Sequence, residues 1–180
     1  MKRTFLFRAL TLFFMATLVA LFFRHFVLEN YVLENNAMAP EIHSGDAVLV
    51  TKYNFSLRLP FSTYELFRFR TPKKNEVVAY TLPYYSGETY VQRVAAGEGE
   101  TVQFTKGVLL INGQSIGEPT PGAPDYGPVE VPPEHFFALN DSRLNNDDSR
   151  AWGPIPYSCL KGRAALLLLS SLERGFRFIR

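Results

Sequence analysis

An apolar segment at the N-terminus limits how the rest of this chain can fold. Between Arg8 and Arg24 the residues 9–23 carry no charge, and their fifteen positions would extend roughly 22 Å as a helix. A bilayer core is about 30 Å thick. Because arginine side chains can snorkel toward the interface, neighbouring apolar residues can join the span. We therefore expect a transmembrane helix over residues 5–27.

A cleaved signal peptide is the alternative interpretation of this segment. The only small-residue site, Leu18-Val19-Ala20, is followed by further apolar residues, which favours a retained anchor. Three basic residues precede the segment, whereas Arg24 is the only one close behind it. The positive-inside rule then predicts that residues 1–8 are cytoplasmic and that residues 28–180 form a domain on the outer face.

Composition argues against several other classes of function. The formal net charge is +2, and no basic stripe with interleaved aromatic residues is present, so nucleic acid is not an expected partner. Cys159 is the only cysteine and can form no internal disulfide. No CxxC or histidine-rich spacing indicates a metal site, and no cofactor is expected.

Beyond the apolar segment the chain reads as a β protein. Short runs rich in apolar, aromatic or β-branched residues are separated by turn residues. These predicted strands are 47–50, 76–81, 90–95, 101–105, 108–111, 135–139 and 164–169. Asn112-Gly113 predicts a two-residue hairpin turn. The stretch 117–128, rich in Pro and Gly, is expected to be a flexible surface loop.

Three ordered motifs follow the apolar segment. They are Glu34-Asn35-Asn36-Ala37-Met38-Ala39-Pro40, Tyr90-Val91-Gln92-Arg93-Val94, and a third that runs from Asn140-Asp141-Ser142-Arg143 to Asp148-Ser149-Arg150-Ala151-Trp152-Gly153. Together they resemble the type I signal peptidases, membrane-bound serine/lysine proteases that remove signal peptides from secreted preproteins. The resemblance implies a folded β-sheet or barrel domain whose strand edges form a groove for an extended peptide.

The resemblance places Ala37 at the position of the nucleophilic serine and Gln92 at that of the general-base lysine. In this chemistry a neutral lysine amine removes the proton of the attacking hydroxyl. A methyl group cannot attack a carbonyl, and a carboxamide is not a useful base near neutral pH. The sequence therefore predicts a homologue that lacks proteolytic activity.

Residues around the dyad positions also differ from the family pattern. Asn35 replaces a serine that helps to bind the oxyanion, and its amide could still donate a hydrogen bond. Asn146 replaces the serine that orients the lysine, and Asn140 replaces a glycine. Several motif residues expected to be structural are retained: Met38, Pro40, Asp141, Asp148, Arg150 and Trp152. At least four functional positions differ together, which favours natural inactivity over a laboratory mutation.

A peptide-binding role does not require the dyad. By resemblance, Met38 and Tyr90 line the small pocket beside the scissile bond, and Leu33 and Ile42 are placed to contribute. The alternative is that these four are ordinary core residues. Glu34 and Glu41 would add negative charge beside a docked peptide. No other pair of Ser, Lys or His residues lies at both dyad positions. We therefore do not expect an active site that has moved to other residues.

Three functions remain open. The first is an inactive, peptide-binding or assembly factor for protein export in the bacterial cytoplasmic membrane, a single-pass protein whose partners would be lipid, signal-peptide-like segments and an active signal peptidase. The second is an active or engineered-inactive signal peptidase. The third is a structural partner of a membrane protein. Its contact surface would be aromatic-rich and would include Phe55, Phe61, Tyr64, Phe67 and Phe69.

Overall fold

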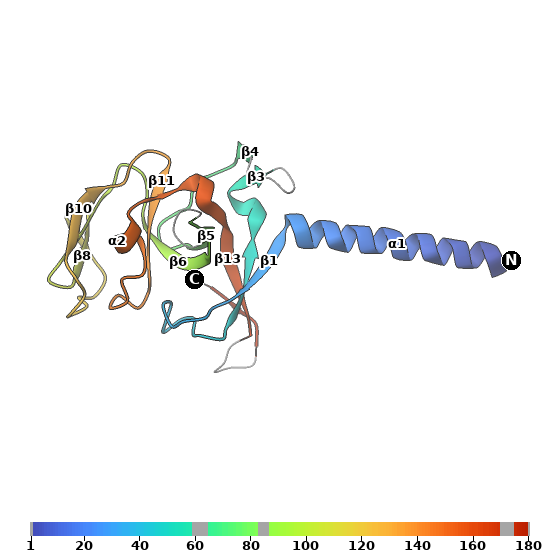
Figure 1. The fold of residues 1–180 in the computed structure, drawn as a ribbon, viewed down its shortest axis with the longest axis horizontal. Coiled ribbons are helices and arrows are strands. Elements are labelled where there is room, and N and C mark those ends of the chain that lie inside the picture. Colours follow the sequence, from blue (N-terminus) through green and yellow to red (C-terminus); the bar gives the residue numbers. More distant parts are fainter. Residues whose placement is uncertain (1, 59–64, 83–86, 170–174, 180) are drawn as a thin grey trace.

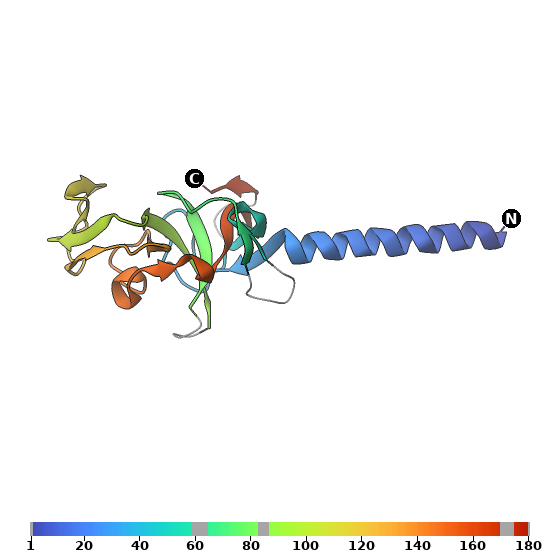
Figure 2. The same cartoon turned by 90° about the horizontal axis from the view of Figure 1, so that it is seen from above.

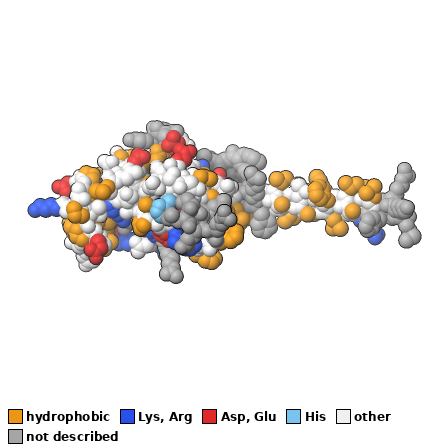
Figure 3. All heavy atoms as spheres, turned by 90° about the horizontal axis from the view of Figure 1, so that it is seen from below, with side chains coloured by type: hydrophobic (Ala, Val, Ile, Leu, Met, Phe, Trp, Pro, Cys, Tyr) orange, Lys and Arg blue, Asp and Glu red, His pale blue; other side chains and the backbone are white. Residues whose placement is uncertain are grey.

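A long helix projects from a β-rich domain in the computed structural model, which describes residues 2–58, 65–82, 87–169 and 175–179 (Figure 1). The helix is α1 (Lys2–Phe26), and the first strand, β1 (Leu28–Val32), follows it almost directly. The structure describes the side chains of α1 from Leu6 to Leu21, and all of them are exposed. Hydrophobic side chains cover much of the helix face seen in Figure 3.

The presence of helix α1 does not by itself show that the chain spans a membrane. Among the residues that the structure describes, no helix is both long enough and apolar enough to cross a bilayer. The span over residues 5–27 stays a prediction.

The main sheet of the domain curls around the core. Its strands, in spatial order, are β1, β2 (Ala47–Thr51), β13 (Leu160–Leu169), β5 (Val77–Thr81), β6 (Thr89–Ala96), β11 (His135–Leu139) and β12 (Ile155–Pro156), and β14 (Arg177–Phe178) also pairs with β13. Its pairings are antiparallel. β1 is an edge strand, because β2 is its only partner in the described part of the sheet.

The remaining elements form smaller units. A second sheet contains β10 (Tyr126–Glu130), β7 (Thr101–Thr105), β8 (Val108–Ile111) and β9 (Gln114–Ile116), in that order. It lies at the end of the domain remote from α1 (Figures 1 and 2). A ribbon of β3 (Ser56–Arg58) and β4 (Glu65–Arg68) pairs by itself. Short helices complete the chain: η1 (Lys52–Asn54), η2 (Tyr157–Cys159) and α2 (Ser149–Trp152).

The predicted all-β fold class is confirmed, and each of the seven predicted strands overlaps an observed one. The Asn112-Gly113 turn is also confirmed, since both residues have positive φ, 52° and 77°, as a type I′ turn requires. The predicted loop 117–128 differs at its end, because β10 begins at Tyr126. Its middle is held to the sheet by the Thr120 N–H, which donates to the Gly107 carbonyl at 2.8 Å.

Gly162 marks the closest approach between two strands of the main sheet. A side chain at this position of β13 would collide with the Thr51 carbonyl and the Val50 side chain of β2. The register between β13 and β2 also shifts twice along their length. Such irregularities bend a strand and increase its twist, which suits a sheet that curls.

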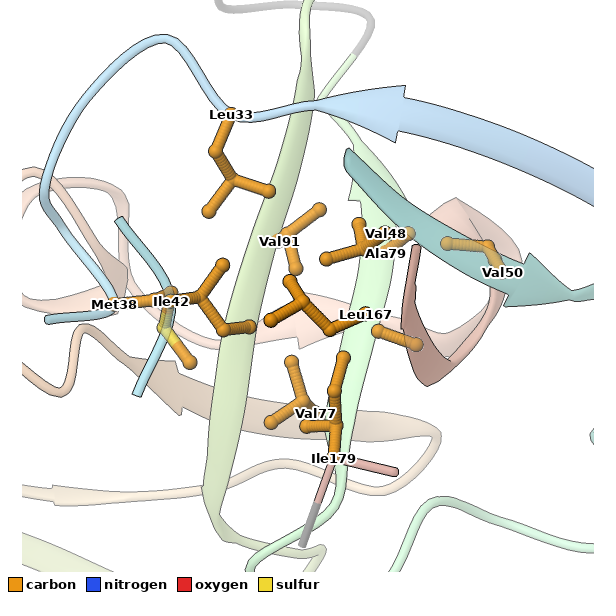
Figure 4. Close-up of a cluster of buried hydrophobic side chains, with 11 residues drawn as sticks. Leu33, Met38, Ile42, Val48, Val50, Val77, Ala79, Val91, Leu167 and Ile179 are labelled. Carbon is orange, nitrogen blue, oxygen red and sulfur yellow. The ribbon is translucent and has the colours of Figure 1, made fainter. Parts of the chain in front are cut away.

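Three clusters of buried side chains form the core. The first lies between β2, β5, β6 and β13 and includes Leu33, Met38 and Ile42 (Figure 4). The second contains Phe55, which is only 3% exposed, so its predicted place on an aromatic surface is wrong. Phe67 and Phe69 are exposed, whereas Phe61 and Tyr64 lie outside the described residues. Each buried large side chain contributes roughly 1.5–3 kcal/mol relative to exposure.

Candidate peptide-binding site at the dyad positions

A pocket of about 360 Å³ lies where the first and second motifs meet. One wall is formed by residues 31–35 and Ala37, and the opposite wall by residues 88–92. Asn140 and Asp147, from the third motif, complete the lining. The structure thus brings Ala37 and Gln92, the residues predicted to occupy the dyad positions, to one cavity.

The Gln92 side chain is held by three hydrogen bonds. Its Nε2 donates to Asn140 Oδ1 at 2.7 Å and to the Asp147 carbonyl at 2.8 Å, while its Oε1 accepts from the Tyr80 hydroxyl. Gln92 is 2% exposed, and Tyr80 and Asn140 are completely buried. Both amide protons are therefore used, as a buried carboxamide requires.

Tyr80 reaches Gln92 because of strand register. In the antiparallel β5–β6 pair, Tyr80 lies opposite Tyr90, and Gln92 is two residues further along the same face. Burial, together with the charge of Asp148, raises the pKa of the Tyr80 hydroxyl well above its ordinary value. The hydroxyl is consequently neutral near pH 7 and able to donate to Gln92.

The Asn35 side chain contacts the backbone of Ala37. Its Oδ1 accepts a hydrogen bond from the Ala37 N–H at 3.0 Å. The backbone N–H of the nucleophile position is a common oxyanion donor in serine hydrolases. Here that N–H is already occupied by a side chain of the same segment, so a substrate carbonyl would have to displace Asn35.

The predicted orienting role of Asn146 is wrong in this structure. Asn146 is exposed, and it is not part of the pocket lining. The side chain that meets Gln92 is Asn140, which reaches the position from the start of the same motif. The neighbouring Asp147 presents its carbonyl to Gln92 and so takes the remaining amide proton.

The retained acid and base of the third motif form a structural centre. The Asp148 carboxylate is completely buried and accepts from the Asn140 N–H and the Arg150 N–H, both at 3.0 Å, which caps α2. Arg150 donates to Asp148 from Nε and Nη2 and to the Arg143 carbonyl at 2.7 Å. This network fixes the loop that carries Asn140 and Asp147.

A second charged cluster ties the motifs to one another. Arg93 donates to both oxygens of Asp141, each at 2.8 Å, and to Glu41 at 2.6 Å. Glu41 therefore shares the single charge of Arg93 with Asp141, and it is not part of the pocket lining. Arg93, Asp141 and Glu41 come from different motifs, so the cluster holds the pocket walls together.

The predicted substrate-binding residues divide into two groups. Leu33 and Tyr90 line the pocket, and the Tyr90 ring packs against Trp152 with ring centroids 4.9 Å apart. Met38 and Ile42 are completely buried and lie within the first core cluster (Figure 4), and neither is part of the pocket lining. Pro40 is exposed and follows a cis peptide bond.

The pocket wall is acidic. Three acidic residues, Glu34, Glu88 and Asp147, belong to the lining, and all three are exposed. No Lys, Arg or His is part of the lining that the described residues form. An approaching cationic side chain would therefore meet a complementary field.

One hydroxyl of the wall contacts an amine. Lys161 Nζ donates to Thr89 Oγ1 at 3.0 Å, and Thr89 Oγ1 is also 3.1 Å from Thr81 Oγ1. Lys161 Nζ lies 5.4 Å from the centre of the Tyr31 ring as well. Both contacts place the Lys161 amine beside residues of the pocket wall.

Comparison with known proteins identifies the family. The family model described as signal peptidase, peptidase S26, matches residues 6–169. The chain belongs to this family. A signal peptidase I of Leptolyngbya laminosa is 32% identical over 84% of this chain and 74% of its own length. Signal peptidase I T of Bacillus subtilis is 33% identical over 75% of this chain and 70% of its own.

A solved structure of a signal peptidase I from Enterococcus faecalis is also similar, at 24% identity and a TM-score of 0.46. The alignment covers 52% of this chain and 97% of that structure. In the part of this signal peptidase family member that is described, no group of three or more His, Cys, Asp or Glu side chains could hold a metal.

Sequence reasoning missed the residues that complete the Gln92 site, namely Tyr80, Asn140 and Asp147. The replacement of a family glycine by Asn140 was visible, but its connection to Gln92 was not, because 48 residues separate them. One sequence feature could have predicted this contact: Gln92 and Asn140 are both carboxamides, and both lie in family motifs that are expected to meet in the folded protein.

Proposed function

We propose that this protein is a non-catalytic member of the signal peptidase family that binds extended peptide segments at the membrane. One observation carries the proposal: the pocket between the strand edges is present, while its two dyad positions hold a methyl group and a carboxamide whose amide protons are both bonded. Neither side chain can perform nucleophilic attack or proton transfer.

Free strand edges support peptide binding. Residues Thr89–Arg93 of β6 pair with β5, whereas β11 joins β6 only from Arg93 to Ala96. Within the described sheet, residues 89–92 therefore have one strand partner. The opposite wall continues from the edge strand β1. A peptide can add to such an edge through main-chain hydrogen bonds without any catalytic residue.

The acidic wall favours segments that carry a basic residue. Glu34, Glu88 and Asp147 surround the pocket, whereas the apolar contacts come from Leu33, Tyr90 and Val91. A peptide with small apolar residues beside a lysine or arginine fits both features. Glu41 is left out of this preference because it contacts Arg93 and is not part of the pocket lining.

Membrane attachment through α1 completes the proposal. The described part of α1 presents exposed apolar side chains with no packing partner in the domain. Insertion into a bilayer would bury them. The excess of basic residues before the apolar segment orients the N-terminus toward the cytoplasm of a bacterial cell and the β domain toward its outer face.

Peptide titration tests the binding role. Full-length protein in detergent is titrated with a labelled Ala-x-Ala peptide that carries one lysine, and we expect saturable binding in the micromolar range. The same peptide with alternate N-methylated amides should bind at least about ten times more weakly, since the main-chain hydrogen bonds are removed. Absence of saturable binding to the unmodified peptide contradicts the proposal.

Charge-reversal variants test the acidic wall. Glu34→Lys and Glu88→Lys should weaken binding of the lysine peptide about 3- to 10-fold at low salt, and the loss should diminish at high salt. Glu130→Lys is the matched control, because this exposed residue lies on β10 outside the pocket lining. An equal effect of Glu130→Lys would show that the wall confers no preference.

Residual proteolysis through Thr89 is the second candidate function. The observation that favours it is the 3.0 Å contact between Lys161 Nζ and a hydroxyl in the pocket wall. Purified protein is incubated with a preprotein, alongside Thr89→Val and Lys161→Met. Cleavage by the parent that both variants abolish would establish this function, and no cleavage by the parent would exclude it.

A further inference from the structure

Two hydrogen-bond acceptors and one hydroxyl surround the side chain at position 92. Asn140 Oδ1 and the Asp147 carbonyl both accept from Gln92 Nε2, whereas the Tyr80 hydroxyl donates to Gln92 Oε1. These groups are buried or part-buried, so water does not compete freely for them. The side of the site that contains Asn140 and Asp147 therefore fits a donor, as the two N–H groups of a carboxamide require.

The Asn140 carboxamide is fixed in this orientation. Its Nδ2 donates to the Asn145 carbonyl at 3.3 Å and to the Asp147 carbonyl at 3.2 Å, which turns Oδ1 toward Gln92. Its backbone N–H is held by the buried Asp148 carboxylate at 3.0 Å. Reversal of the amide would break both side-chain contacts, so Asn140 cannot readily offer a donor to position 92.

A general-base lysine needs the opposite surroundings. It must be neutral, and burial achieves this only when few acceptors stabilise the ammonium form. An amine at position 92 would carry up to three N–H donors and would meet Asn140 Oδ1, the Asp147 carbonyl and the Tyr80 oxygen. Hydrogen bonds to the charged form favour that form. The glycine usual in the family at the position of Asn140 presents no side-chain acceptor.

We propose that Asn140 is a positioning residue that adapts this pocket to a neutral carboxamide at position 92 and prevents a lysine there from acting as a base. This inference rests on the proposed non-catalytic role and extends it. Three residues, Ala37, Gln92 and Asn140, then each prevent activity. Restoring the serine and the lysine of the dyad would leave Asn140 to hold the lysine in its charged form.

Titration of an introduced lysine tests the inference directly. Full-length Gln92→Lys protein, with lysine Cε labelled with carbon-13, is titrated by NMR in detergent. With Asn140 present, the additional lysine signal should titrate near or above the ordinary value of about 10.4. Adding Asn140→Gly or Asn140→Ala should lower the pKa by about 2 units or more, because burial then lacks its compensating acceptor.

Asn145→Gly is the matched control. It removes the hydrogen bond from the Asp147 N–H to the Asn145 side chain but keeps Asn140 and the Asn145 carbonyl, so it measures how far a change in the loop alone shifts the titration. The shift should be smaller than the shift on removal of Asn140. Thermal unfolding establishes that each variant is folded. A lowered pKa in Gln92→Lys alone overturns the inference, and this single variant suffices if the double variants do not fold. An unchanged pKa on removal of Asn140 also overturns it.

Preprotein cleavage gives a second measurement. Ala37→Ser/Gln92→Lys should be inactive, and the added Asn140→Gly should raise cleavage at least about 100-fold, the usual contribution of general-base catalysis. Cleavage by the double variant overturns the role of Asn140. Peptide binding by the parent protein is independent of both results, so failure of the proposed function would be distinguished from failure of this inference.

Discussion

At the scale of single residues, Gln92 has a structural role at the position that the resemblance assigns to the general base. Its carboxamide joins Tyr80 on β5 to Asn140 and Asp147 in the third motif. In a serine/lysine dyad, the lysine amine must lie within reach of the attacking hydroxyl and must be able to accept its proton. Gln92 instead donates both amide protons to protein acceptors, and its loss would remove three hydrogen bonds from a buried site.

Replacement of Gln92 by alanine should therefore lower the free energy of unfolding by about 2–4 kcal/mol, since buried partners lose their hydrogen bonds and a cavity forms. Denaturant-induced unfolding measures the change. Gln103→Ala is the matched control: Gln103 is half-buried on β7 and donates only to Thr105, so a change within about 0.5 kcal/mol is expected. Equal losses would contradict the structural role of Gln92.

The Glu76 carboxylate offers a pH-dependent test. Burial raises its pKa, but hydrogen bonds from Arg70 and the Lys73 N–H and the nearby charge of Arg163 outweigh burial, so the net pKa is lowered. A carboxyl with a lowered folded pKa stabilises the fold above its unfolded pKa, and this stabilisation is lost as pH falls through the folded value.

Glu76→Gln should then destabilise the protein by about 1–3 kcal/mol at pH 7. The difference from the parent should shrink as pH falls below about 4.3, the ordinary glutamate value, and disappear once the parent carboxyl is protonated. Unfolding curves between pH 7 and pH 3 measure this. Exposed Glu118→Gln should show no such trend, and a constant gap at all pH values would refute the assignment.

At the scale of elements, the main sheet depends on close approach between β13 and β2. Gly162 is the residue that permits it, because any Cβ there would collide with the Thr51 carbonyl. Close packing leaves such a collision no room to relax without a backbone shift.

We expect Gly162→Ala to cost about 1–3 kcal/mol in unfolding free energy. Gly97→Ala is the control, since no atom lies within 4 Å of a Cβ built there. That substitution should be neutral or stabilise the fold by up to about 1 kcal/mol, because alanine lowers the conformational entropy of the unfolded chain. Comparable destabilisation by both variants would show that crowding at Gly162 is not the cause.

The same elements show what could be learned from sequence. Strands such as 101–105 and 108–111 were predictable because their alternation and the Asn112-Gly113 turn are local signals. β1, β10 and β12 were missed, since their pairing depends on partners distant in sequence. β3, β4 and β14 were also missed, although each pairs with a strand nearby in the sequence. In the pocket, motif resemblance brought Ala37 and Gln92 together. It could not show that Asn140, not Asn146, meets Gln92, because side-chain reach depends on the loop conformation.

At the scale of the whole molecule, α1 and the β domain present different surfaces. The helix carries exposed apolar side chains, while the domain buries three apolar clusters of its own. The helix has no part in those clusters. Its role must therefore be sought outside the domain, and we have proposed a bilayer.

Alkaline extraction of bacterial membranes tests that proposal. The full-length protein should stay in the membrane pellet, and Met15→Arg/Leu18→Arg should move at least half of it to the soluble fraction, because each central arginine costs about 2.5–3.5 kcal/mol. Phe176→Arg, on an exposed site of the domain, is the control and should remain in the pellet. Complete extraction of the parent would contradict membrane insertion.

The nearly direct passage from α1 into β1 sets how far the binding pocket can lie from a bilayer. Only residues 27–30 separate the end of the helix from Tyr31 in the pocket wall, a reach of roughly 15 Å for extended chain. A ligand anchored in the same bilayer would meet the pocket at a high effective concentration. Weak intrinsic affinity would then suffice for membrane-bound segments, while the same sequence free in solution would scarcely compete.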